Sequence, residues 1–177
     1  MDNLISLNEL KRLLEVGDNT VYIAIVKKEP DMPEPPKPTL PLIWDNRLTQ
    51  RGVTITTLLP PPGELYWRLV AAKWYDERES AGKHHVFMDL LDENGKRLVG
   101  AKVKITWNGG ETVVLCEAKP GEPYGANYPM HNLAPAFNAQ PIGGVADKVM
   151  GMGLGSIEDP NHGIHTSYGF VWQLVRA

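Results

Sequence analysis

Two Asn-Gly pairs, Asn94-Gly95 and Asn108-Gly109, constrain the fold of this 177-residue chain more than any other feature. Each pair stands between stretches in which apolar and polar residues alternate, and Asn-Gly in that setting is a strong signal for a β-hairpin. The segment 84–115 therefore predicts strands joined by tight turns. Because no helical period follows residue 29, we expect residues 43–177 to form an antiparallel β-sandwich.

Residues 64–75 predict a long strand and residues 167–175 predict the last strand. The first is long enough to contain a bulge. In the second, four large apolar side chains share one face, because alternate side chains of a strand point to the same side. We expect this face to lie in the core, and its residues are Tyr168, Phe170, Trp172 and Leu174.

The first 29 residues predict a separate arm, made of a short helix and a strand. Ser6 and Glu9 have the spacing of a capping box, and Gly17 is a natural helix end. A helix of about three turns is not stable alone and a lone strand needs a sheet edge, so both must pack against something. That support comes either from the chain's own sandwich or from a neighbouring subunit. The predicted partner-binding residues are Leu7, Leu10, Leu14, Tyr22, Ile23 and Ile25.

Prolines at positions 30, 33, 35, 36, 38 and 41 separate the arm from the sandwich. Proline fixes φ and lacks an N–H, so this density excludes a helix or a central strand. We expect a polyproline II spacer of about 3.1 Å per residue, with a ligand for an aromatic-lined domain as the less common alternative. The predicted organisation is an arm at 1–29, a spacer at 30–42 and a sandwich at 43–177.

Charge and composition argue against several classes of partner. The net charge of −3 and the pI near 5.9 are unlike those of a strongly electropositive nucleic-acid binder or of a protein that docks on anionic lipid. No run approaches the roughly 20 apolar residues of a membrane span. The N-terminus lacks the features of a signal peptide. We therefore expect a protein that is cytoplasmic before release and then extracellular or virion-associated.

No motif for catalysis or phosphate binding stands out. Gly151, Gly153 and Gly155 match neither the dinucleotide fingerprint nor a phosphate-binding loop. His84 and His85 are adjacent, so in a strand their side chains would point to opposite faces.

Histidines in a predicted loop give the one metal hypothesis. His162 and His165, with His131 or Asp159, could approach a zinc site, but no spacing fixes such a set. Cys116 is the only cysteine, so it cannot form an intrachain disulfide. We expect no enzymatic activity, no metal and no cofactor.

Large aromatic residues are frequent for one small domain, and most of them should fill the core. Rings that stand beside Asn, Asp and Glu in loops are suited to carbohydrate stacking or to a protein contact. The predicted ligand-binding residues are Trp74, Tyr75, Tyr124, Tyr128 and His131.

Two resemblances to known families extend this interpretation. The unit "DLLDENGKRLVGAKVKITWNGG" at 89–110 is similar to the strand–hairpin–strand unit of transthyretin-like and carboxypeptidase-regulatory-like sandwiches. The stretches "IWDNRLTQRGVTIT", "YWRLVAAKWYDERESAGKHHVFMDLLDENG", "EAKPGEPYGANYPM", "VMGMGLG" and "IHTSYGFVWQ" resemble accessory domains appended to bacterial cell-wall hydrolases of the lysozyme type. The resemblances imply an Ig-like or transthyretin-like sandwich that is not itself catalytic.

The sequence therefore predicts a non-catalytic structural or adhesive protein. We expect a component of a phage virion or of another extracellular assembly, of the decoration, fibre or tail type, that engages a neighbour or a copy of itself through its arm. A free-standing module for peptidoglycan or another polysaccharide is the first alternative, and an accessory subunit of a cell-wall hydrolase is the second.

Overall fold

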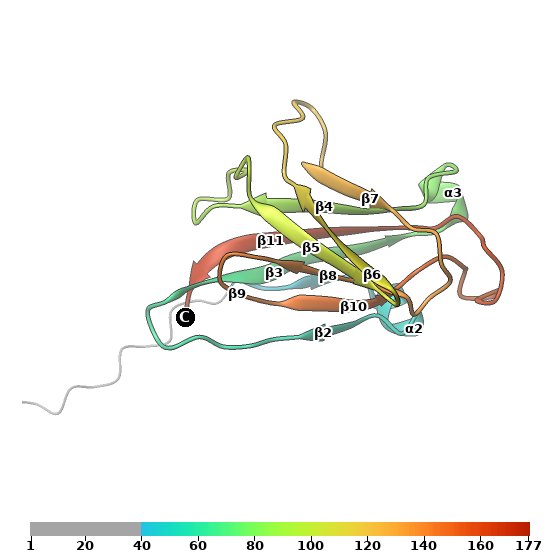
Figure 1. The fold of residues 1–177 in the computed structure, drawn as a ribbon, viewed down its shortest axis with the longest axis horizontal. Coiled ribbons are helices and arrows are strands. Elements are labelled where there is room, and N and C mark those ends of the chain that lie inside the picture. The colour runs from blue at the N-terminus through green and yellow to red at the C-terminus, as the bar shows by residue number, and fades with distance from the viewer. Residues whose placement is uncertain (1–39) are drawn as a thin grey trace, which may run out of the picture. The chain divides into compact units, whose positions relative to one another are not determined.

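A computed structural model describes residues 40–177, and the predictions for the arm and for most of the spacer lie outside these residues. Two β-sheets make up the described part of the chain (Figure 1). The first, which we call the β11 sheet, has the strand order β1 (Ile43–Trp44), β3 (Leu65–Tyr75), β11 (Ser167–Arg176), β4 (His85–Leu91) and β7 (Ala126–Pro129), with β9 (Val145–Ala146) paired to β3. The second, the β5 sheet, has the order β2 (Thr54–Thr56), β10 (Lys148–Met152), β8 (Phe137–Pro141), β5 (Lys102–Trp107) and β6 (Gly110–Leu115).

The inner faces of both sheets supply one apolar core. The predicted face of β11 is confirmed, because Tyr168, Phe170 and Trp172 are all completely buried and Leu174 packs, partly buried, against the same core. The β5 sheet contributes Ile105 and Phe137, which are buried equally well. Large side chains removed from water on this scale are the main source of stability in a domain of this size. The prediction of a mainly β protein with two sheets is therefore confirmed, while its Ig-like or transthyretin-like character stays a prediction.

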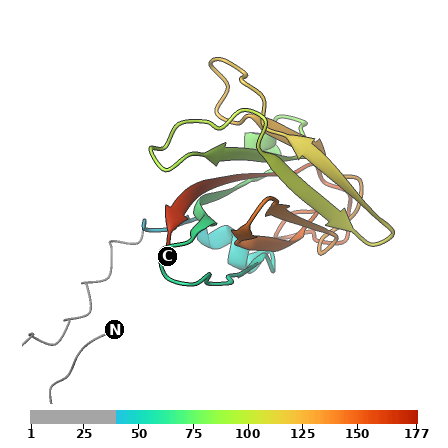
Figure 2. The same cartoon turned by 60° about the vertical axis from the view of Figure 1, so that its left-hand side comes forward.

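The β11 sheet is mixed, so the prediction of a purely antiparallel sandwich is wrong. Strand β11 pairs antiparallel with β3 on one side and parallel with β4 on the other. Figure 2 shows β11, in red, between the two green strands. Strands β1 and β9 also run parallel to β3. The reason lies in the connections, because β4 and β11 are far apart in the chain and no hairpin forces opposite directions on them.

The two Asn-Gly turns have different outcomes. Asn108-Gly109 joins β5 to β6 in the predicted hairpin, and Gly109 has a φ of +94°. At Asn94-Gly95 the chain also turns tightly, and Leu91 bridges Arg97 beyond the turn. The returning segment then leaves the β11 sheet and enters the β5 sheet as β5. This turn therefore connects the two sheets and does not close a long hairpin.

Two short helices occur in segments for which we predicted no helix. Helix α2 (Asn46–Gln50) follows β1, and α3 (Glu77–Ser80) occupies part of the charged loop after β3. Asp76 and Glu79 form a capping box at the start of α3. Neither helix of the described part has the length and apolar character needed to cross a membrane.

The bulge that we predicted in the first long strand is present at Val70. In the pairing of β3 with β11, Ala71 lies opposite Val171 and Leu69 lies opposite Trp172, so Val70 has no partner. The buried carboxylate of Asp147 accepts a hydrogen bond of 2.8 Å from the Leu69 N–H next to the bulge. This side chain thus satisfies a backbone donor where the bulge disrupts the ladder.

Replacing Asp147 with alanine should lower the free energy of unfolding by about 1–3 kcal/mol, because the buried Leu69 N–H loses its acceptor. Asp147→Asn keeps an acceptor oxygen and should recover most of the loss. Denaturant unfolding measures both variants, with the exposed Glu158→Ala as a control. Equal stability of Asp147→Ala and the wild type would show that this hydrogen bond does not support the bulge.

Candidate functional site

The five predicted ligand-binding residues do not lie together. Trp74 is buried, with 3% of its surface exposed, so the prediction that it binds a ligand is wrong. The bulge at Val70 is the cause, because one extra residue moves every later side chain of β3 to the opposite face. Trp74 therefore joins Trp67 and Leu69 on the inner face.

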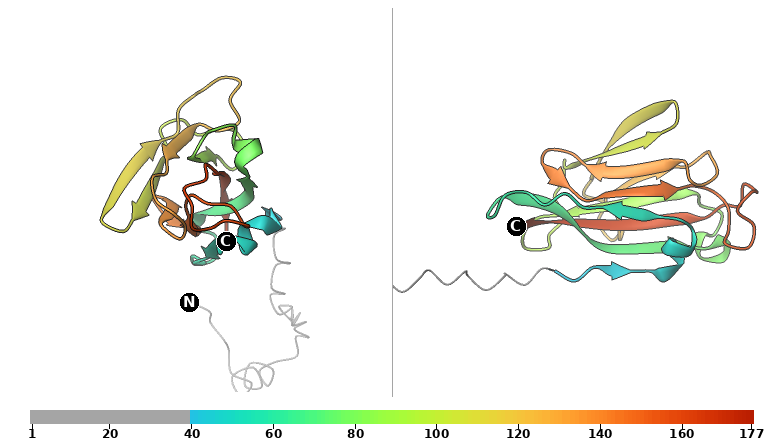
Figure 3. Two further views of the ribbon diagram at one scale, coloured as in Figure 1. Left: turned by 90° about the vertical axis from the view of Figure 1, so that its right-hand side faces the viewer. Right: turned by 90° about the horizontal axis from the view of Figure 1, so that it is seen from below.

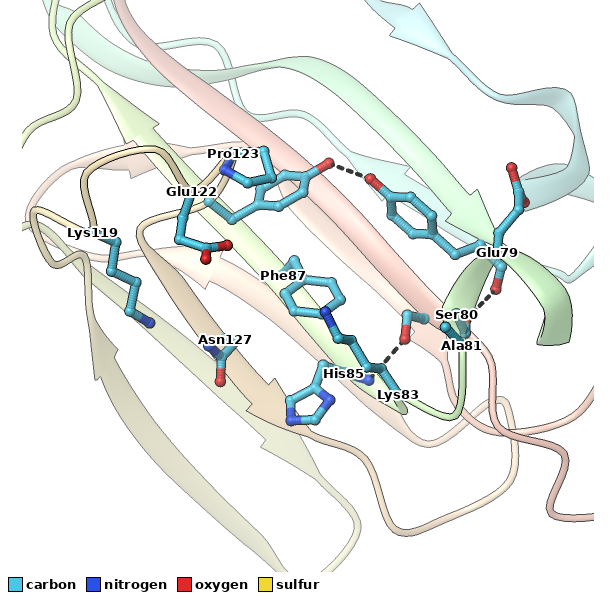
Figure 4. A pocket seen from close by; sticks show the side chains of 13 residues that line it. Glu79, Ser80, Ala81, Lys83, His85, Phe87, Lys119, Glu122, Pro123 and Asn127 are labelled. Atoms are coloured by element: carbon cyan, nitrogen blue, oxygen red, sulfur yellow. Dashed lines mark hydrogen bonds between the residues drawn. The ribbon is translucent and has the colours of Figure 1, made fainter.

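Tyr75 and Tyr124 lie together in a groove of about 620 Å³ on the outer face of the β11 sheet. Figure 4 shows this groove, which we call the Phe87 groove after the ring at its centre. Its floor is made by side chains from strands, one wall comes from helix α3 and the turn after it, and the other wall comes from a loop. The strands contribute Tyr75, His85, Phe87, Asn127 and Ser167, α3 and its turn contribute Glu79, Ser80, Ala81 and Lys83, and the loop contributes Lys119, Glu122, Pro123 and Tyr124.

Aromatic rings form the floor of the Phe87 groove. The Phe87 ring stacks on Tyr124 with centroids 5.7 Å apart and on His85 with centroids 5.5 Å apart. Tyr75 meets Phe87 edge to face, with centroids 6.4 Å apart. Strand alternation places Phe87 here, because Val86 and Met88 on either side point into the core. Phe87 was not predicted as a site residue, and His85 was considered only together with His84, although the alternation of this strand is visible in the sequence.

The hydroxyl groups of Tyr75 and Tyr124 form a hydrogen bond with each other, with their oxygen atoms 2.9 Å apart. The ring of Tyr124 lies over Gly169 of β11, where a Cβ would come within 2.6 Å of Cζ of Tyr124 and 3.1 Å of Cε2 of Tyr75. Only glycine leaves room for the pair at this position. Burial, followed by the hydrogen bond to Tyr75, raises the pKa of Tyr124. The Tyr124 phenol therefore stays neutral at physiological pH.

Arg97 holds the wall that carries Tyr124, which is the 117–124 loop. Its guanidinium pairs with both oxygens of the Asp89 carboxylate, at 2.8 and 3.0 Å. It also donates to the backbone carbonyls of Ala118, Lys119 and Glu122 at 2.8–3.1 Å. The hydrogen bond to Asp89 is the main reason that the pKa of Arg97 is raised. One side chain thus ties three carbonyls of the loop to the sheet.

The opposite wall is held by Arg47 and the α3 capping box. Arg47 donates to the Glu79 carboxylate at 3.0 Å and to the Trp74 carbonyl at 2.9 Å. Burial acts to raise the pKa of Glu79, but the hydrogen bonds from Arg47 and from the Asp76 N–H, with the charge of Arg47, hold it below its ordinary value. Glu79 is therefore an ionised structural group with its charge already compensated.

Charged and polar groups surround the aromatic floor. The Lys83 ammonium lies 5.9 Å from the centroid of the Phe87 ring, and Lys119 pairs with Glu117 at 3.2 Å. Burial, followed by the charges of His84 and Lys83, lowers the pKa of His85. His85 is thus a neutral ring at pH 7 and can stack without the cost of burying a charge.

Tyr128 and His131 belong to a different cluster. Tyr128 is on the inward side of β7, and its ring stacks on Trp107 with centroids 5.5 Å apart. His131 meets Trp107 and Phe137 edge to face. Neither residue lines the Phe87 groove. Of the five predicted residues, the structure therefore brings only Tyr75 and Tyr124 to this groove.

The histidines that were considered as metal ligands do not lie together either. His162 contacts Asp159, whereas the His165 ring lies 4.6 Å from the His84 ring. His84 precedes β4, and its ring lies 5.1 Å from that of His85, so the prediction that the two point to opposite faces is wrong. Within residues 40–177, no three His, Cys, Asp or Glu side chains are arranged to hold a metal ion.

Comparison with known proteins identifies no relative of this chain. The chain matches no protein-family model, no curated protein and no solved structure. Its resemblance to accessory domains of cell-wall hydrolases therefore stays a prediction, and the groove must be interpreted from its own chemistry.

Replacing Arg97 with alanine should lower the free energy of unfolding by about 3 kcal/mol, because Asp89 is left largely buried without its partner. Arg97→Lys keeps the charge but loses the planar fork, so amide hydrogen exchange should become faster in the 117–124 loop. Arg176→Ala is the matched control, since its pair with Glu93 is half exposed and should contribute less than about 1 kcal/mol. Unchanged exchange in Arg97→Lys would contradict the role of Arg97 in holding the loop.

Proposed function

We propose that residues 40–177 form a non-catalytic binding module and that the Phe87 groove takes a carbohydrate. The observation that carries this proposal is the half-buried Phe87 ring, left open on the outer face of a strand and surrounded by polar side chains. An outward position on a solvated sheet face is normally polar. An aromatic floor with a few polar groups is the usual composition of a small-molecule site.

A sugar is suited to a groove with an aromatic floor and a polar rim. One face of a pyranose ring presents C–H groups that can lie on Phe87 or Tyr124, while its hydroxyl groups need donors and acceptors at the rim. Asn127 offers both, and the ammonium of Lys83 and the carboxylate of Glu122 offer one each. The volume of about 620 Å³ lies within the range of pockets that hold small ligands.

The walls support binding because they are fixed by contacts within the protein. Arg97 ties down one wall, the Arg47–Glu79 pair secures the other, and the Tyr75–Tyr124 hydrogen bond joins the first wall to strand β3 of the floor. A site that is already ordered loses little conformational entropy when a ligand enters. The same features support a binding role over catalysis, since Glu79 is held ionised by Arg47 and is poorly suited to donate a proton.

The assembly role predicted from the arm stays a separate proposal. Its residues lie outside the described part of the chain, so neither a virion origin nor an extracellular location gains support from the sandwich. Peptidoglycan as the particular glycan, and service as a hydrolase accessory subunit, are likewise still predictions. The Phe87 groove is compatible with each of them, because an adhesive component also needs a ligand site.

Phe87→Ala should weaken carbohydrate binding by about tenfold or more, because it removes the ring on which a sugar would stack. A glycan array would identify ligands of the wild type, and isothermal titration calorimetry would compare the variants. His131→Ala is the matched control, since it removes an exposed ring outside the groove. Trp74→Ala is unsuitable because it would create a cavity in the core.

Two results would contradict the proposal. One is the absence of any saturable binding to the array by a folded wild type. The other is an equal loss of affinity in Phe87→Ala and His131→Ala. Binding of peptides and of no carbohydrate would show that the groove takes a different class of ligand.

A further inference from the structure

The turn after α3, the start of β4 and the start of β11 form one end of the Phe87 groove. His85 is the first residue of β4 and Ser167 is the first residue of β11, and these two strands run parallel. The left view of Figure 3 looks onto the end of the sandwich where α3 and the loop that leads into β11 lie. Lys83, His85 and Ser167 line the groove here, and we call this part the Lys83 end.

The His85 ring offers a hydrogen-bond donor at the Lys83 end. Its Nδ1 accepts the backbone N–H of His84 at 3.3 Å. A neutral imidazole has one donor nitrogen and one acceptor nitrogen, so the proton of this ring is on Nε2. Because His85 lines the groove, its Nε2–H is available to a ligand there.

Lys83 adds a positive charge that no carboxylate balances in the described part of the chain. Its ammonium lies 5.9 Å from the centroid of the Phe87 ring. The Glu79 carboxylate on the same wall is already engaged by Arg47 at 3.0 Å and by Lys73 at 3.6 Å. A cation beside an aromatic floor, with no anion of the protein paired to it, favours a ligand that carries a negative charge.

The opposite wall of the groove has a different charge. Figure 4 shows Glu122 and Lys83 entering the groove from opposite sides of Phe87. The Glu122 carboxylate repels an anion, and Lys119 on the same loop already pairs with Glu117 at 3.2 Å. A ligand with one negative group is therefore favoured in the orientation that places this group at the Lys83 end.

We infer that the Phe87 groove selects acidic sugars, with the carboxylate of a uronic acid at the Lys83 end. This inference rests on the proposed carbohydrate function and adds the class of the sugar. With the sugar ring on Phe87, its carboxylate would accept hydrogen bonds from the Lys83 ammonium and from the Nε2–H of His85. Hydrogen bonds between ionised groups are about twice as strong as those between neutral groups. Because the net charge of the chain is −3, attraction to an acidic sugar must come from this local arrangement.

An array of paired oligosaccharides tests the inference on the full chain. The two members of each pair differ only in whether the sugar ring carries a hydroxymethyl group or a carboxylate. The wild type should bind the acidic member roughly tenfold more tightly, as measured by titration calorimetry on the pair with the highest affinity. Lys83→Met removes the charge and should abolish this preference, whereas Lys83→Arg should retain it. Circular dichroism would establish that the variants are folded.

Lys96→Met is the matched control, since Lys96 is exposed, lies outside the groove and changes the net charge equally. It should keep the preference for the acidic member. Equal or tighter binding of the neutral member by the wild type would overturn the inference and leave the carbohydrate proposal intact. A preference that persists in Lys83→Met, or that is lost equally in Lys96→Met, would also overturn it. Binding of neither member by the folded wild type would contradict both proposals.

Discussion

The double pairing of β11 is the constraint on which the described structure depends. This last strand lies between β3 and β4 and bonds to both along most of its length. Its inner face supplies Tyr168, Phe170 and Trp172 to the core, and the indole N–H of Trp172 donates to the Asp147 carbonyl. Without β11, the strands that carry the two walls of the groove would have no common support.

The outer face of the same strand shapes the candidate site. Gly169 provides the space in which Tyr75 and Tyr124 meet, and the Ser167 hydroxyl accepts a hydrogen bond from the His85 N–H. One face of β11 therefore contributes to the core, and its opposite face contributes to the groove.

Local patterns predicted local structure well. The alternation in 167–175 located the core face of β11, and Asn108-Gly109 located the β5–β6 hairpin. The strand directions were not predictable in this way, because the parallel pairing of β4 with β11 joins segments far apart in the sequence. The capping box of α3 was visible in the spacing of Asp76 and Glu79 but was masked by the high charge of the segment.

In the candidate site, too, local features were predictable and features that depend on the folded chain were not. Tyr75 and Tyr124 were predicted from their polar surroundings. Trp74 was misplaced because a bulge shifts the alternation by one residue, and a bulge cannot be positioned from propensity alone. The role of Arg97 was not predicted, because it depends on Asp89 and on carbonyls of a distant loop, which only the folded chain brings together.

The central claim is that the fold itself forms the groove before any ligand enters, and hydrogen exchange of Gly169→Ala tests it most directly. The added methyl group would displace Tyr124, so the amides of the 117–124 loop should exchange faster while the core of the β11 sheet stays protected. Gly163→Ala, at a glycine with open space around it, should leave exchange unchanged. Unaltered protection of the loop in Gly169→Ala would contradict the account, because Tyr124 would then not depend on the space above β11.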